Sequence, residues 1–222
     1  MVRGRGADPR LLSAALVTLV VVAGCWRLGE PMPSEALVSW VAYPETVQVG
    51  ATFSFEFAGP VSPNACGRLD TATLAITDST IELAARRSTF QAMCARQKVS
   101  FYEARPIEIM TPGRYLVRTS TGGDLGTLVA TDSGPFSSIK TWGEGTIRHL
   151  AGCWLFGPGW IGGQRLFALS GLPEDLEEIP TDRIVYVRGR LRGFASCGSW
   201  GSRPRIRVDT AWATGRRVRD LY

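Results

Sequence analysis

The pattern that most restricts the fold is a strict alternation of aromatic and polar side chains at Thr52–Phe57. Phe53, Phe55 and Phe57 fall on one side of an extended chain, and the polar residues between them fall on the other. Successive side chains of a β-strand point to opposite faces, so a period of two is typical of a strand with one buried face. The segment therefore predicts a β-sheet that contributes aromatic side chains to a core.

Short apolar segments separated by turn residues continue through positions 37–131, and none of them has the period of a helix. The expected strands are Leu37–Tyr43, Leu69–Ile76, Thr80–Ala84, Lys98–Glu103, Ile107–Met110, Tyr115–Arg118 and Leu125–Ala130. Many short strands at this spacing favour an antiparallel sandwich. We therefore expect an all-β domain over residues 37–133.

A turn at Thr111–Gly113 leads directly into Tyr115 at the start of a late strand. This arrangement resembles the tyrosine corner of immunoglobulin-like domains. Together with Val49-Gly50 before the phenylalanine strand, it makes the domain similar to bacterial immunoglobulin-like or fibronectin-type modules. The Cys–Trp–Cys spacing of antibody domains is missing, so the resemblance does not extend to that branch.

The polar segment Thr131–Pro135 predicts a domain boundary, and the charge balance changes sign after it. Residues 25–136 hold 9 basic and 11 acidic side chains, whereas residues 137–222 hold 13 basic and 8 acidic ones. A net charge of +5 on the second part favours an anionic partner.

Residues 137–215 predict a second, smaller all-β domain. Its expected strands are Gly145–Leu150, Cys153–Phe156, Arg165–Ser170, Arg183–Leu191 and Arg205–Trp212, with a short helix at Leu172–Ile179. Five strands with a helix after the third suggest a small closed barrel of the OB type. Five short segments resemble an uncharacterised OB-like domain of bacterial envelope proteins: Gly152–Trp154, Phe167–Leu169, Leu172-Pro173, Val187–Leu191 and Ala195–Cys197. That resemblance implies the barrel and a Cys153–Cys197 disulfide.

The N-terminal segment has the layout of an export signal. Three arginines and one aspartate in Met1–Arg10 precede the apolar stretch Leu11–Cys25, which is shorter than the roughly 20 residues of a membrane-spanning helix. The ending Val22-Ala23-Gly24-Cys25 resembles the bacterial lipobox. It implies cleavage after a 1–24 signal peptide, acylation of Cys25, and a tether over residues 25–36. The alternative is an ordinary signal peptide with a coincidental cysteine.

The other cysteines form an even set once Cys25 carries lipid. Cys66, Cys94, Cys153 and Cys197 allow three pairings, of which Cys66–Cys94 with Cys153–Cys197 keeps each bridge within one half of the chain. The competing reading is a metal site. No CxxC motif is present and His149 is the only histidine, so we expect disulfides and no metal.

Two features of the second domain are candidate binding surfaces. Trp160 lies in the glycine-rich segment Gly157–Gly163, where an exposed indole can contact a partner or a sugar, although capping of the barrel is the more ordinary role. Six arginines alternate along two predicted strands and would form a basic surface beside Tyr186 if the strands are adjacent; they are Arg188, Arg190, Arg192, Arg203, Arg205 and Arg207. A solvated strand face is the alternative.

Enzyme signatures are missing from the sequence: there is no nucleophile elbow, no phosphate loop and no recognisable carboxylate pair. We therefore expect a non-enzymatic, lipid-anchored envelope protein, without a cofactor, that serves as an accessory or scaffold subunit for another envelope protein. The alternative is a module that binds a glycan or an anionic lipid. Nucleic acid is not expected outside the cell. Trp26 after Cys25 resembles the signal for an outer-membrane rather than an inner-membrane destination.

Overall fold

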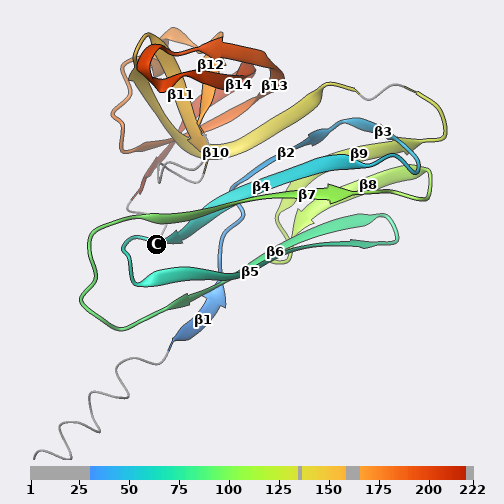
Figure 1. Ribbon diagram of the computed structural model, residues 1–222, viewed down its shortest axis with the longest axis horizontal. Coiled ribbons are helices and arrows are strands. Elements are labelled where there is room, and N and C mark those ends of the chain that lie inside the picture. The colour runs from blue at the N-terminus through green and yellow to red at the C-terminus, as the bar shows by residue number, and fades with distance from the viewer. Residues whose placement is uncertain (1–30, 135–136, 159–165, 219–222) are drawn as a thin grey trace, which may run out of the picture.

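The computed structural model describes residues 31–134, 137–158 and 166–218, and most of this chain is β-strand (Figure 1). The prediction of an all-β fold is confirmed. Six strands form one sheet, called sheet A: β1 (Met32–Glu35), β3 (Thr46–Gln48), β5 (Gly67–Thr77), β6 (Thr80–Thr89), β8 (Gly113–Thr119) and β9 (Asp124–Thr131). The order along this sheet is β1-β6-β8-β9-β3, and β5 pairs with β6 as well.

Eight strands form the second sheet, called sheet B: β2 (Trp40–Pro44), β4 (Phe53–Ser62), β7 (Val99–Ile107), β10 (Ile139–Leu150), β11 (Cys153–Pro158), β12 (Phe167–Ser170), β13 (Arg183–Ser196) and β14 (Ser202–Arg217). Its order is β11-β12-β14-β13-β10-β2-β4-β7. The strands β2, β4 and β7 face sheet A across an aromatic core, which gives the expected sandwich.

The other end of sheet B closes on itself because β10 also pairs with β11. The ring is β10-β11-β12-β14-β13-β10, with β12 parallel to β14 and the other neighbours antiparallel. This is a small five-stranded barrel, as expected for an OB-like domain. It lies above the sandwich in Figure 1.

The segment expected to be a helix at Leu172–Ile179 is instead one turn of 3₁₀-helix at Glu174–Leu176. Pro173 and Pro180 leave too little chain between them for a stable α-helix. The turn nevertheless has a packing role, because it carries Leu176 into the barrel core, where this side chain is 1% exposed.

The sandwich and the barrel share strand β2, which connects their two cores. Val41 and Tyr43 face the sandwich core, whereas Trp40 and Ala42 face the barrel core. The Trp40 ring is fully buried, with its centroid 5.2 Å from that of Phe167. Strand β2 lies between β4 of the sandwich and β10 of the barrel, so one continuous sheet runs through both parts.

Three local predictions have clear outcomes. The Tyr115 hydroxyl donates a 2.8 Å hydrogen bond to the carbonyl oxygen of Thr111, which is the contact expected of a tyrosine corner. The predicted tether is shorter than expected, because Met32–Glu35 at its end pairs with β6 as strand β1. No strand is found at Ile107–Met110 beyond the end of β7.

Both predicted disulfides are present. Cys66 is bonded to Cys94 across 28 residues, and Cys153 is bonded to Cys197 across 44 residues. The first closes a loop of the sandwich, and the second connects the start of β11 to the loop after β13.

Candidate functional site: a groove between the sandwich and the barrel

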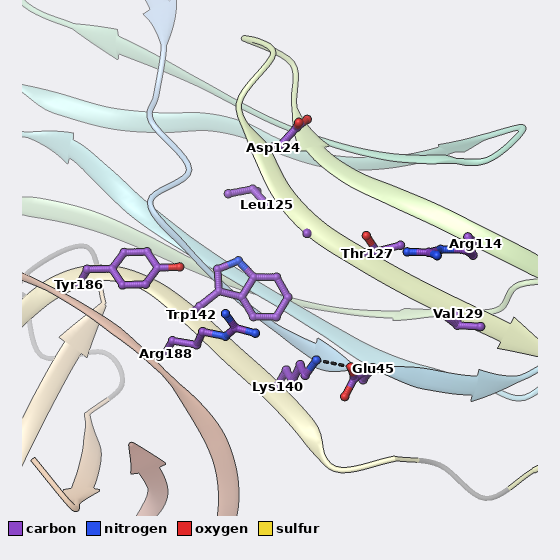
Figure 2. Close-up of a pocket in the computed structure, with 11 residues that line it drawn as sticks. Glu45, Arg114, Asp124, Leu125, Thr127, Val129, Lys140, Trp142, Tyr186 and Arg188 are labelled. Carbon is purple, nitrogen blue, oxygen red and sulfur yellow. Dashed lines mark hydrogen bonds and ion pairs between the residues drawn. The ribbon is translucent and has the colours of Figure 1, made fainter. Parts of the chain in front are cut away.

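Sheet B extends further than the sheet that covers it. Trp142 lies opposite Val41, and Lys140 lies opposite Tyr43, so these β10 side chains share the face that β2 turns toward the sandwich core. The same face continues through Arg188 and Tyr186 of β13. Sheet A does not reach over β13, and the result is a floor of aromatic and basic side chains (Figure 2).

The wall of the groove is the edge of β9. Strand β3 pairs with β9 only at Val129–Thr131, which leaves Leu125–Thr127 without a strand partner on that side. The Leu116 N–H donates to Ser79, away from β9, so Leu116 and Thr127 form a non-hydrogen-bonded pair. The N–H and C=O groups of Thr127 therefore point outward, along the free edge.

Floor and wall enclose a groove of about 470 Å³. Its lining combines residues from β8, β9, β10, β13 and the segment before β3: Glu45, Arg114, Asp124, Leu125, Gly126, Thr127, Val129, Lys140, Trp142, Tyr186 and Arg188. A second hollow of about 280 Å³ shares Asp124, Leu125, Trp142 and Tyr186 with the first, and extends toward Leu37–Ser39. The volume of the first groove is in the range of ordinary ligand sites.

Trp142 holds the floor against the wall. Its indole meets the ring of Tyr43 edge-on, with 4.8 Å between centroids. Gly126 has a φ of +116° and lies so close that a Cβ atom there would be 2.5 Å from the Trp142 ring. The Tyr43 hydroxyl also reaches the carbonyl oxygen of Leu125 at 3.4 Å. These contacts join the floor to the wall at the inner end of the groove.

The charged residues of the groove differ in whether they are neutralised. Lys140 forms an ion pair with Glu45, and Glu144 at the edge of the second hollow forms one with Arg216. Arg188 and Arg114 are exposed and make no ion pair or hydrogen bond within the described residues. Asp124 is an acidic residue at one end of the groove. The lining of the groove thus carries two guanidinium groups that are available to an anionic ligand, Arg188 on the floor and Arg114 on the outer face of sheet A.

Tyr186 is fixed at the outer side of the floor by an aromatic stack. Its ring lies 4.3 Å from that of Trp212, its cross-strand partner on β14, with 23° between the planes. Partial burial raises the pKa of the Tyr186 hydroxyl, with a smaller contribution of the same sign from Glu144, while Arg188 acts in the opposite direction. Tyr186 therefore stays a neutral hydrogen-bond donor at physiological pH.

The six predicted arginines lie on adjacent strands, since β13 pairs with β14, but they form two groups. Arg188, Arg190 and Arg207 lie on the barrel wall, where Arg190 is directly opposite Arg207. Arg192, Arg203 and Arg205 lie nearer the tip of the β13–β14 hairpin, and the Nε groups of Arg203 and Arg205 donate to the carbonyl oxygens of Trp200 and Arg192. Of the six, Arg188 alone lines the groove.

The outer surface of β11 and β12 is the face with which OB folds commonly bind ligands. Here Leu155 and Ala168 on that face are each 1% exposed and form a small cluster with Leu166 and Cys197. The Cys153–Cys197 disulfide connects Cys197 of this cluster to the start of β11. Leu155 and Ala168 on the β11–β12 face are thus covered, whereas side chains on the β10–β13 face line the groove.

The remaining candidates have simpler positions. Phe156 and Phe167 are buried in the barrel core, and the partly buried Trp154 packs against it. The exposed His149 packs on Trp154, with ring centroids 4.8 Å apart. Cys25 and Trp160 lie outside the described residues. Within the described residues, no cluster of three histidines, cysteines or carboxylates could hold a metal ion. No helix in that part of the chain has the length and hydropathy to cross a bilayer.

Comparisons of the chain with protein-family models, with curated proteins and with solved structures give no match. What the site does therefore has to follow from its own geometry and charges. Sequence reasoning singled out Arg188 and Tyr186, but it did not bring Trp142, Arg114 or the β9 edge into a site. One signal was readable: Trp40–Tyr43 is apolar at every position, which indicates a strand buried on both faces and hence two layers that meet at β2.

Proposed function

We propose that this chain is a lipid-anchored cell-envelope protein, not an enzyme, that binds another envelope protein as an accessory or scaffold subunit. The observation that carries the proposal is the groove, in which an aromatic and basic floor meets an unpaired strand edge. Such an edge offers main-chain hydrogen bonds to a polypeptide, and the floor offers side-chain contacts. The lipobox-like segment ending at Cys25 supports a place at a membrane, with the outer membrane favoured.

The anchor is tested in the native cell with a Cys25→Ser variant. Loss of the acylated thiol should release the protein from membranes or block its processing. If the variant still fractionates with membranes and is still shortened after Gly24, lipid anchoring is wrong.

The binding role is tested by mild detergent extraction of the native membrane after chemical crosslinking. We expect the full-length protein to co-purify with a defined envelope protein, and we expect the Arg188→Glu variant to lose that partner. An Arg207→Glu variant serves as the control, because Arg207 is exposed on the same barrel but does not line the groove. Recovery of no partner by the unmodified protein would remove the main support for a scaffold role.

A second candidate function is binding of an acidic glycan or an anionic lipid. The observation in its favour is the outer barrel wall, where Arg190 and Arg207 lie beside the stacked pair Tyr186 and Trp212. Trp212 is 47% exposed, so one face of its ring is open to a sugar or a lipid headgroup. Binding screens against envelope polysaccharides and anionic vesicles test this candidate. An Arg190→Ala/Arg207→Ala variant that binds as well as the unmodified protein would count against it.

A further inference from the structure

The groove has the shape of a sandwich that lacks one strand. Sheet B continues through β10 and β13, but the sheet above it ends at β9, because β3 is only three residues long. A strand added beside Leu125–Thr127 would extend sheet A over the exposed floor. It would satisfy the outward N–H and C=O groups of Thr127 and cover the half-buried rings of Trp142 and Tyr186.

The charges of the groove indicate which kind of strand fits. Alternate side chains of an added strand would point down to the floor, where Arg188 lies between Trp142 and Tyr186. The other side chains would point outward, on the face of sheet A that carries Arg114. Lys140 is already neutralised by Glu45, so it does not compete with Arg188 for a carboxylate. A carboxylate on the floor side of the added strand would therefore meet the guanidinium of Arg188, whereas the acidic Asp124 lies on β9 at one end of the groove.

We propose that the groove binds an extended acidic segment of a partner protein, which adds to the free edge of β9 at Leu125–Thr127 and places a carboxylate on Arg188. This inference rests on the proposed protein-binding function and names the part of the partner that is recognised. Main-chain pairing supplies a sequence-independent contribution to affinity, and Arg188 with the flanking aromatic rings supplies the preference for sequence.

The test uses the full-length protein in detergent and two hexapeptide probes, acetyl-TVDVTV-amide and its lysine analogue acetyl-TVKVTV-amide, at up to millimolar concentration. We expect the aspartate peptide to bind with one peptide per chain and to slow amide hydrogen exchange over Leu125–Leu128. The lysine peptide should bind about tenfold more weakly or worse, as expected for an unfavourable charge in the site. The Arg188→Glu variant should reverse that preference, and Arg207→Glu should leave it unchanged.

Three results would overturn the inference: binding of neither peptide, binding without slower exchange at the β9 edge, or equal effects of Arg188→Glu and Arg207→Glu. A dimer in which the β9 edge is protected before any peptide is added would also overturn it, since the occupant would then be a second copy of the chain. The co-purification experiment separates these failures from failure of the function. A captured partner without peptide binding leaves the scaffold role standing, whereas peptide binding without any cellular partner leaves the groove without its proposed role.

Discussion

The indole of Trp142 lies directly against the backbone of Gly126, and this contact joins the barrel to the sheet A edge of the sandwich. The two residues are on different sheets. They lie so close that a methyl group added to Gly126 would clash with the Trp142 ring. This contact holds the inner end of the groove. Its contribution to the free energy of unfolding can be measured without any ligand.

Gly126→Ala should lower the free energy of unfolding by about 3 kcal/mol, because the Cβ atom would clash with Trp142 and an alanine at φ +116° is strained. Gly122→Ala is the matched control: Gly122 also has a positive φ, of +88°, but a Cβ atom there would meet nothing within 4 Å. Urea denaturation followed by circular dichroism measures both. Equal destabilisation of the two variants would mean that the contact with Trp142 adds nothing.

Trp40→Ala should destabilise the whole molecule by about 3–5 kcal/mol, as expected for removal of a fully buried indole. Since β2 carries Trp40 between the two cores, we also expect one unfolding transition for the sandwich and the barrel together. Trp200→Ala is the control, because Trp200 is 43% exposed, and it should cost less than about 1 kcal/mol. Two resolved calorimetric transitions, with only one moved by Trp40→Ala, would contradict this prediction.

Tyr115→Phe should cost about 1 kcal/mol, because the Thr111 carbonyl loses the hydrogen bond that it accepts at the tyrosine corner. Tyr186→Phe removes a hydroxyl that makes no hydrogen bond within the described residues, so its effect should stay within about 0.5 kcal/mol. Chemical denaturation measures the free energy of unfolding of both variants. If Tyr115→Phe costs no more than Tyr186→Phe, the tyrosine corner does not stabilise the sandwich.

Stability should fall in strongly alkaline solution because of Tyr43. Burial raises the pKa of its hydroxyl far above the ordinary value near 10, with smaller contributions from the nearby Glu45 and Tyr186. A group whose pKa is higher in the folded protein contributes stability that is complete below the unfolded pKa and is lost as the pH rises above it. The free energy of unfolding of the unmodified protein should therefore decrease above about pH 10. Tyr43→Phe should lessen that decrease, and an unchanged pH profile would show that Tyr43 is not the source.

Local patterns were sufficient for the parts of the fold that depend on neighbours in the chain. The alternation at Phe53–Phe57 predicts β4, and the turn before Tyr115 predicts its hydrogen bond. The five-strand order of the second half predicts a closed barrel, and the parallel pairing of β12 with β14 is part of its closure. These features follow from period, turn chemistry and order, all of which are readable within short windows.

The groove could not be predicted in the same way, because it depends on residues that are far apart in the sequence. Trp142 becomes part of the groove only because it lies on the outer side of the barrel, opposite Val41 of β2. The β9 edge is free at Leu125–Thr127 because β3 begins only at Thr46, after the chain has crossed from sheet B to sheet A, and pairs with β9 from Val129 onward. Strand boundaries and long-range pairing are the properties that local patterns determine least well.

The double pairing of β10 has a consequence for how this chain can vary in length. Residues Ile139–Gly143 are in register with β2, and Gly145–Leu150 are in register with β11. Side chains alternate between faces, so an insertion of one residue near Glu144 would turn one half of the strand inside out while the other half kept its face. Either Trp142 would leave the groove or Ile147 would leave the barrel core. We therefore expect insertions and deletions among related chains to fall in the connections around β10 and not within it.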